Sequence, residues 1–252
     1  NLVNLYNLNN QNNLTYVNNL NNLNNLNNLN KLDALYNSDY EQTFNSTLFF
    51  NQYGELVKYY NKKHLIPFGE TLPFGRKINK WISEQITSIS LFARGDSYVL
   101  FKNRNGFYFT SVICYEMLFP EYLREVLNGL VDEQGRHREV HFLVNLSNDS
   151  WYGKVEPEQH LFLSRWRAAE FNLPVVRSTN TGISTVIYPS GELGGRIEVN
   201  RQGYLDFTLF SPERTPTIYQ RYGVMVVIAF AFGLIVLAAV LTVIVPKHKP
   251  LS

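Results

Sequence analysis

Cysteine and charge are both scarce in this chain of 252 residues. The single cysteine excludes an internal disulfide framework and any zinc or iron–sulfur site built from several thiolates. Charged residues make up 17% of the chain, against about 25% in ordinary soluble domains. The 23 basic and 21 acidic side chains nearly cancel, so the sequence lacks the concentrated basic excess of a nucleic-acid-binding protein.

The N-terminal segment consists almost wholly of Asn and Leu. From Asn18 to Asn30 the triplet Asn-Asn-Leu repeats without interruption. A three-residue period fits neither a helix with one apolar face nor the alternation of a strand. We therefore predict that residues 1–31 are a disordered low-complexity tract, with a transient helix or a binding segment as alternatives.

Residues 32–211 have the patterning of a globular domain in which strands alternate with helices. This order favours a layered α/β fold. Two hairpins are expected, around Gln52-Tyr53-Gly54 and around Asn105-Gly106, the latter a strong hairpin signal. Helices are predicted at 76–86, 120–130 and 157–171, and strands at 46–51, 55–60, 98–101, 107–114, 140–146, 175–178, 183–188, 196–199 and 204–210.

A long uncharged run lies near the C-terminus. From Tyr222 to Val245 no residue is charged and nearly all are apolar. These 24 residues would make about 36 Å of helix, enough to cross a hydrocarbon core of roughly 30 Å. We predict a linker at 212–221, a transmembrane helix at 222–245 and a short basic tail at 246–252. Basic residues flank both ends of the run, so their distribution gives no orientation.

The single cysteine, Cys114, ends an apolar strand and is followed two residues later by Glu116. The C-terminal ends of strands open onto the crevice where α/β proteins bind ligands. A thiolate there can act as a nucleophile if a cation or a base lowers its pKa or takes its proton. The alternative is a small buried hydrophobic residue with no chemical role.

Three further segments combine polar residues with the ends of predicted elements. Residues 60–70 hold Lys62, Lys63, His64 and Glu70, which are either a solvated loop or a source of fixed positive charge for an oxyanion. His64 invites a dyad with Cys114, although sequence alone does not place them together. Residues 145–153 follow a buried strand and either cap a turn or line a site. Residues 159–170 form the third segment, a predicted helix whose Arg167 and Glu170 are i,i+3 partners that could simply brace the fold.

These segments, in this order and followed by one terminal span, resemble the apolipoprotein N-acyltransferases. The stretches that carry the resemblance are Tyr-Asn-Lys-Lys-His-Leu-Ile-Pro-Phe-Gly-Glu, Ile-Cys-Tyr-Glu, Ser-Asn-Asp-Ser-Trp-Tyr-Gly, Arg-Trp-Arg-Ala-Ala-Glu and Ser-Thr-Asn-Thr-Gly-Ile. That family is a membrane-embedded branch of the nitrilase, or carbon–nitrogen hydrolase, superfamily. The resemblance implies a nitrilase-like α-β-β-α sandwich, incomplete at its N-terminal side, followed by one transmembrane helix.

The resemblance also implies an activity: transfer of an acyl chain from a phospholipid, through a cysteine thioester, to the N-terminal amine of a diacylglyceryl-modified lipoprotein. Carried over residue by residue, Cys114 resembles the nucleophile and Lys62 the catalytic lysine, because Lys62 stands eight residues before Glu70. Glu70 and Glu116 match accessory acidic residues of the family. Neither the residues nor the resemblance predicts a cofactor or a metal.

Two aromatic residues complete the implied site. Tyr115 would offer its backbone N–H to the oxyanion, and Trp151 resembles an aromatic residue that lines the acyl-chain or headgroup region. The implied partners are the phospholipid donor, the lipoprotein acceptor and the membrane. The implied location is the bacterial cytoplasmic membrane, with the catalytic domain facing the periplasm.

The sequence departs from the family at the general base. In the superfamily a glutamate in a Pro-Glu motif precedes the lysine by several dozen residues, and Glu41 and Glu55 lie too close to match it. The chain therefore resembles the C-terminal part of the enzyme, from a truncated gene, a split gene or a longer chain. A split gene would add a separately encoded N-terminal half as a partner. The alternatives are a membrane-anchored amidase or nitrilase acting on a small substrate, and a catalytically inactive fragment.

Overall fold

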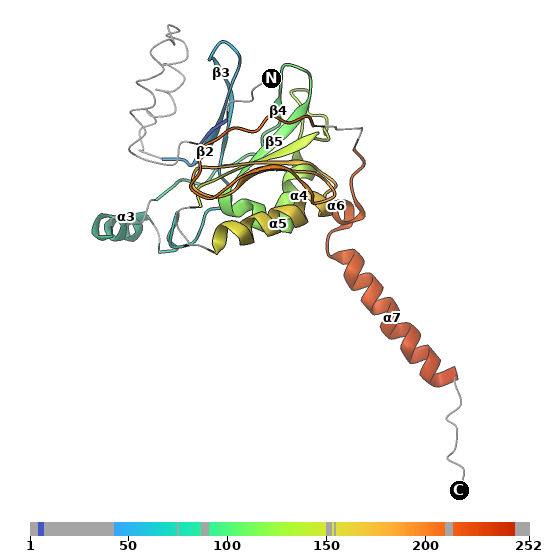
Figure 1. Ribbon diagram of the computed structural model, residues 1–252. Coiled ribbons are helices and arrows are strands. Elements are labelled where there is room, and N and C mark those ends of the chain that lie inside the picture. The colour runs from blue at the N-terminus through green and yellow to red at the C-terminus, as the bar shows by residue number, and fades with distance from the viewer. Residues whose placement is uncertain are drawn as a thin grey trace.

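The computed structural model describes residues 5–7, 43–74, 76–86, 91–149, 153, 155–209 and 214–244. The described part of the domain is layered (Figure 1). A small sheet packs on one face of a larger sheet, and helices α4 (Pro120–Gly129) and α5 (Glu156–Glu170) cover the other face. Helix α3 (Arg76–Gln85) projects from one side, as predicted for residues 76–86.

The small sheet is antiparallel and contains the first predicted hairpin. Its strands lie in the order β1 (Leu5–Asn7), β2 (Ser46–Phe50) and β3 (Leu56–Asn61). Gly54 has a φ of 77° in the turn between β2 and β3, a conformation that glycine adopts without steric cost. Strand β1 lies within the tract predicted to be disordered, and the rest of residues 1–42 lies outside the described residues.

The large sheet has six strands in the order β4-β5-β6-β7-β8-β9. Strands β5, β6 and β7 are parallel, whereas the outer pairs β4–β5, β7–β8 and β8–β9 are antiparallel. The C-terminal ends of the three parallel strands therefore meet at one edge. The strands are β4 (Phe101–Lys102), β5 (Tyr108–Ile113), β6 (Phe142–Ser147), β7 (Val175–Thr179), β8 (Ser184–Ile187) and β9 (Leu193–Ile197).

Two apolar clusters hold the layers together. Between the sheets, the ring of Phe49 packs edge-on against Phe101 and Phe109, at 5.8 and 5.3 Å between centroids. On the other face, the helices bury a cluster that includes Val112 and Leu143. All six residues of β6 are buried, which is the pattern of a strand covered on both faces.

The predicted strands at the end of the sheet need correction. The strand predicted at 196–199 is β9, which begins earlier at Leu193 and ends at Ile197. The strand predicted at 204–210 is wrong for 204–209, which adopt no regular structure, and residue 210 lies outside the described part. The apolar alternation there is misleading because the large sheet ends at β9, and Tyr204 is 82% exposed.

The described part of the predicted linker, residues 214–221, is packed against the domain. It contains α6 (Ile218–Tyr222), capped by Thr217, whose hydroxyl also donates to the Glu170 carbonyl at 2.8 Å. Gly223, with a φ of 60°, separates α6 from α7 (Met225–Ile244). No helix in the described ranges combines the length and the apolarity needed to cross a membrane, so the predicted span at 222–245 is not confirmed.

Candidate active site

Cys114 lies at the C-terminal end of β5, in a strained turn. It is the first residue of the 3-10 helix η1 (Cys114–Leu118) and is half-buried. Its φ of 50° lies in the left-handed region, which costs a residue other than glycine of order 1–3 kcal/mol. Strain of this kind persists where the surrounding structure imposes it, and it is frequent at functional sites.

Lys62 immediately follows β3 and is fully buried. Its ammonium group donates to both carboxylate oxygens of Glu70, at 2.7 and 2.9 Å. Glu70 also accepts from the Asn45 amide at 3.0 Å and from the Ile66 N–H at 2.9 Å. A buried cation is tolerated only with such partners, so Glu70 holds the Lys62 ammonium group in a fixed position.

The electrostatic surroundings of Cys114 link it to this lysine. Burial raises the pKa of the Cys114 thiol above its ordinary value. Lys62 opposes that rise through its positive charge, and Ser147 opposes it through a hydrogen bond, whereas Asp149 and Glu70 add to it. The cysteine is therefore mainly a protonated thiol at neutral pH, and a nucleophilic role needs a group that takes its proton.

Glu116 forms hydrogen bonds with both the turn that carries Lys62 and the turn that carries Cys114. It is fully buried in η1, and its two carboxylate oxygens accept hydrogen bonds from three elements. These bonds hold the chain after β3 against the chain after β5. The donors are the hydroxyls of Tyr60 (2.7 Å) and Tyr122 (3.0 Å) and the backbone N–H groups of Lys63 (2.9 Å), His64 (2.9 Å) and Ile113 (2.8 Å).

Lys63 and His64, the two residues that follow Lys62, each contact an aromatic ring. The ammonium group of Lys63 lies 3.8 Å from the centroid of the Tyr98 ring. The His64 ring packs against Phe119, with 4.4 Å between centroids. The geometry therefore does not favour the Cys–His dyad that the sequence invited.

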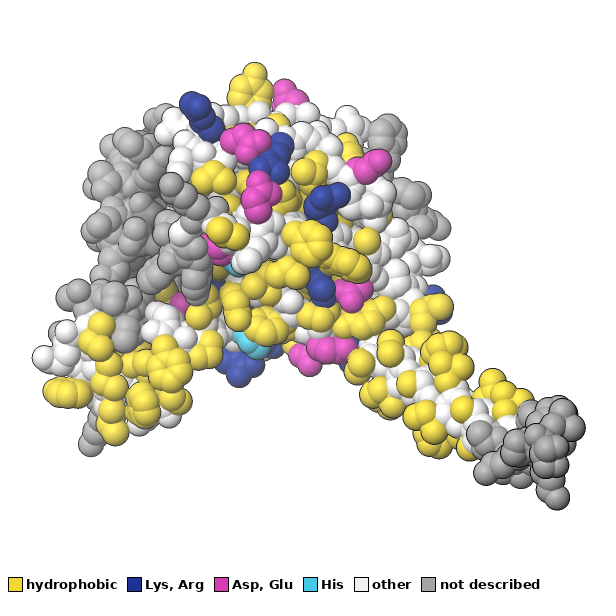
Figure 2. All heavy atoms as spheres, turned by 60° about the horizontal axis from the view of Figure 1, so that its bottom comes forward, with side chains coloured by type: hydrophobic (Ala, Val, Ile, Leu, Met, Phe, Trp, Pro, Cys, Tyr) yellow, Lys and Arg dark blue, Asp and Glu magenta, His cyan; other side chains and the backbone are white. Residues whose placement is uncertain are grey.

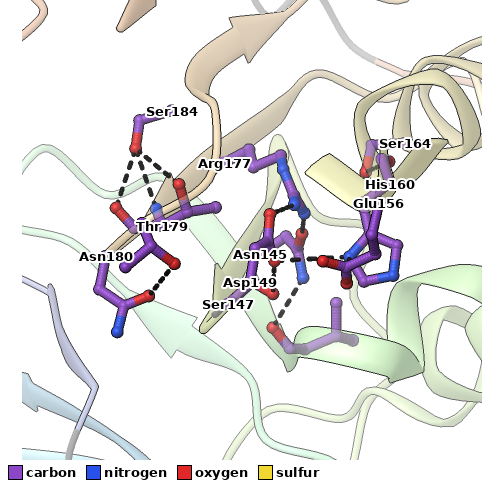
Figure 3. A network of polar contacts seen from close by, with 12 residues as sticks. Asn145, Ser147, Asp149, Glu156, His160, Ser164, Arg177, Thr179, Asn180 and Ser184 are labelled. Atoms are coloured by element: carbon purple, nitrogen blue, oxygen red, sulfur yellow. Dashed lines mark hydrogen bonds and ion pairs between the residues drawn. The ribbon is translucent and has the colours of Figure 1, made fainter. Parts of the chain in front are cut away.

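A buried polar network lies at the ends of β6 and β7 (Figure 3), and two of its members, Ser147 and Asp149, influence the pKa of Cys114. Asp149 accepts from the Ser147 hydroxyl at 2.6 Å and from the Arg177 guanidinium at 2.6 Å, and His160 Nδ1 lies 3.4 Å from it. Burial alone would raise the pKa of Asp149, but the contacts with His160 and Arg177 outweigh it and hold that pKa below its usual range. Arg177 also donates to Asn145.

Residues 145–153 and 159–170 were predicted to be candidate site segments, but the pairing of Asp149 with Arg177 and His160 was not predicted. The sequence signal that could have revealed the network is Arg177 inside the apolar strand β7. A charged side chain in a buried strand needs a buried partner. Asp149, Glu156 and His160 also have ligand atoms within 4.8 Å of one another, as a metal site would. Asp149 is already ion-paired to Arg177, which disfavours a second cation there.

The remaining predicted residues are Tyr115 and Trp151. Tyr115 is the second residue of η1, and its ring packs edge-on against Phe119 with 4.9 Å between centroids. Trp151 lies outside the described residues. The structure therefore brings together Cys114, Lys62, Glu70 and Glu116 and places Tyr115 beside them.

Comparisons with known proteins agree with the sequence motifs. The carbon-nitrogen hydrolase family matches residues 26–208. The apolipoprotein N-acyltransferase of Bradyrhizobium diazoefficiens is 35% identical over 209 residues, covering 82% of this chain and 37% of that protein. The apolipoprotein N-acyltransferase of Vibrio cholerae is 33% identical over 193 residues, covering 74% and 36%. The chain thus spans about a third of the length of these curated relatives.

Solved structures are similar at lower identity. A member of branch 10 of the nitrilase superfamily from Saccharomyces cerevisiae is 18% identical with a TM-score of 0.45, covering 64% of this chain and 52% of that chain. An amidase from Nesterenkonia sp. is 18% identical with a TM-score of 0.42, covering 61% and 51%.

Proposed function

Because the chain belongs to the carbon-nitrogen hydrolase family, we propose that it carries the nucleophile and the lysine of an N-acyltransferase. The proposed reaction moves an acyl chain from a phospholipid onto Cys114 and then onto the N-terminal amine of a diacylglyceryl-modified lipoprotein. The names of the curated relatives support this reaction class. The observation that carries the proposal is that Glu116 holds the turn of the fully buried Lys62 against the turn of the single cysteine, where the charge of Lys62 lowers the pKa of the thiol.

In the first step the Cys114 thiolate attacks the ester carbonyl carbon of the phospholipid, and negative charge develops on the carbonyl oxygen. We assign the stabilisation of that oxyanion to Lys62 and the backbone N–H of Tyr115, since preorganised donors act without reorganising during the reaction. The leaving alkoxide takes up the proton that the Cys114 thiol had given to the general base and departs as a lysophospholipid, and the acyl group stays on sulfur. In the second step the lipoprotein amine attacks the thioester, loses a proton and regenerates the thiolate.

The other site residues have supporting roles in this proposal. Glu70 holds the Lys62 ammonium group by two hydrogen bonds. Glu116 holds the turn that carries Lys62 against the turn that carries Cys114. Trp151 is assigned to the acyl-chain or headgroup region on the strength of the family motif alone.

Membrane attachment fits the proposed substrates, which both lie in a bilayer. We propose that residues 222–245 anchor the chain in the bacterial cytoplasmic membrane, with the domain on the periplasmic side. The support is the uncharged run from Tyr222 to Val245 and the exposure of apolar side chains along α7, such as Phe230 at 68% and Ile235 at 67%. Figure 2 shows that apolar side chains cover the helix that projects from the domain.

Acylation of Cys114 tests the proposal directly. The chain is incubated with phospholipid vesicles, with and without the N-terminal part of a relative, and the Cys114 peptide is analysed by mass spectrometry. In the presence of that N-terminal part we expect a mass gain of one acyl group that hydroxylamine removes, as it removes a thioester, and none in Cys114→Ala. Hydrolysis of a short amide without any lipid adduct would instead indicate an amidase acting on a small substrate.

A further inference from the structure

Ser147 is a buried neighbour of the candidate nucleophile. Strands β5 and β6 are parallel, and their register pairs Ile113 with Leu146. Cys114 and Ser147 are the residues that directly follow this pair, so the register places them side by side, and a hydrogen bond from Ser147 lowers the pKa of the Cys114 thiol. Ser147 is 2% exposed, so its hydroxyl must find its partners within the protein.

The Ser147 hydroxyl has one proton and two candidate acceptors. It donates to Asp149 Oδ1 at 2.6 Å. While that bond is made, the Ser147 oxygen can only accept a hydrogen bond from the Cys114 thiol. A thiolate has no proton to donate and is stabilised by a donor, so the hydroxyl must turn away from Asp149 to serve it.

Asp149 can lose the hydrogen bond from Ser147 because its contacts with Arg177 and His160 remain. Arg177 holds Oδ2 at 2.6 Å, and His160 Nδ1 lies 3.4 Å from Oδ1 (Figure 3). The turn at Gly182 approaches so closely that a Cβ there would lie 2.0 Å from Asp149 Oδ2. The carboxylate is therefore held in place whether or not the Ser147 proton points at it.

We propose that Ser147 is a further catalytic residue, whose hydroxyl accepts from the Cys114 thiol at rest and turns from Asp149 to the sulfur when the thiolate forms. Asp149 is a positioning residue that acts through Ser147. Among the described residues, the charged groups that act on Cys114 from the other elements are Lys62, after β3, and Glu70, in the turn that follows. The inference rests on the proposed role of Cys114 as nucleophile, but it concerns the thiol itself and needs no acyl transfer.

The test is the pH dependence of Cys114 alkylation by iodoacetamide in the full chain. Cys114 is the single cysteine, so the rate reports one site, and its proton passes to the buffer. Ser147→Ala removes the donor to the thiolate, and we expect the midpoint of the rate profile to rise by about one pH unit. Asp149→Asn removes a nearby negative charge and weakens the hold on the hydroxyl, so its midpoint should fall.

The midpoints of the two variants are thus expected to shift in opposite directions. A purely structural role would shift both midpoints in the same direction or shift neither. Ser147→Thr keeps the hydroxyl and should restore the midpoint. The matched control is Ser164→Ala, a buried serine whose hydroxyl donates to the His160 carbonyl at 2.7 Å, and its profile should not move. An unchanged or lowered midpoint in Ser147→Ala overturns the proposal, even if Asp149→Asn does not fold. A failed lipid-acylation experiment would leave this result standing.

Discussion

Two consecutive lysines show how much one residue of register matters at this site. Lys62 is fully buried and ion-paired with Glu70 at 2.7 Å, whereas Lys63 lies over the Tyr98 ring and donates to a backbone carbonyl at 3.2 Å. Burying an ion pair brings little net stability, because desolvation offsets the attraction. The position of Lys62 is therefore better explained by the charge that it presents to Cys114.

At this scale we expect Lys62→Met to raise the pH at which Cys114 becomes reactive. The charge of Lys62 lowers the pKa of the thiol, so its removal leaves burial, Glu70 and Asp149 to raise that pKa further. The measurement is the midpoint of the iodoacetamide rate profile. In a complete enzyme, Lys62→Ala should slow acyl-enzyme formation about a hundred- to a thousandfold, the loss of an oxyanion donor.

Lys63→Met is the matched control for this prediction. It removes a partly exposed cation that contacts Tyr98, and its alkylation profile should match that of the unsubstituted chain. A shifted profile in Lys63→Met and an unchanged one in Lys62→Met would mean that the register of the site is off by one residue.

At the scale of elements, Glu116 joins β3 and the turn that follows it to η1 and α4, which lie more than fifty residues later in the sequence. It accepts from Tyr60 in β3, from Tyr122 in α4 and from the backbone after β3. A carboxylate suits this place because it only accepts hydrogen bonds and offers two oxygens to several donors. Helix η1 is thereby fixed to the small sheet as well as to the large one.

Glu116→Gln should destabilise the domain and loosen the turn that carries Lys62. The new amide group is itself a donor and would face donors, leaving at least one buried group unsatisfied, at about 1–3 kcal/mol each. Urea unfolding of the variant measures the loss. Glu125→Gln, an exposed change in the following helix α4, should be close to neutral, and equal stabilities of the two variants would contradict the role assigned to Glu116.

Elements defined by local signals were predictable, and those defined by distant partners were not. The hairpin at Asn105-Gly106 and the helix from Pro120 were expected and are present, because turn chemistry and helix starts are written in adjacent residues. The pairing of Asp149 with Arg177 depends on the register of β6 and β7, which no local pattern fixes. The extra strand expected at 204–210 had a suitable alternation but no neighbouring strand.

At the scale of the whole molecule, α6 sets where α7 leaves the domain. Asn128 of α4 donates to the Gln220 carbonyl at 3.0 Å, and Tyr219 donates to Glu121 at 3.0 Å. The Tyr219 ring also packs edge-on against Phe171, with 5.6 Å between centroids. These contacts fasten the base of α7 to the helical face of the domain (Figure 1).

If residues 222–245 span the membrane as proposed, the two ends of the chain have opposite access to protease. Protease added to intact spheroplasts should digest the domain and spare a tag placed after Ser252. Disruption of the membrane should expose the tag. A protected domain with a cleaved tag would reverse the proposed orientation, and cleavage of both in intact spheroplasts would contradict the span.

The carboxylates around Cys114 decide whether this chain can turn over by itself. Among the described residues they are each engaged: Glu70 holds Lys62, Asp149 holds Arg177, and Glu116 accepts hydrogen bonds from the two turns. A general base must have a free lone pair within reach of the proton that it takes, and it typically contributes a factor of about a hundred to ten thousand. The thiol of Cys114, with its raised pKa, needs such a base.

We therefore expect no multiple turnover from the 252-residue chain when a diacylglyceryl peptide and phospholipid vesicles are supplied. Adding the N-terminal part of a relative should restore peptide N-acylation if the two pieces assemble, because that part can bring a further carboxylate to the thiol as a general base. The measurement is N-acylated peptide per mole of chain, with Cys114→Ala as the control. Multiple turnovers by the chain alone, lost in Cys114→Ala, would show that one of the engaged carboxylates leaves its partner and takes the proton; Glu70→Gln and Asp149→Asn would then identify which.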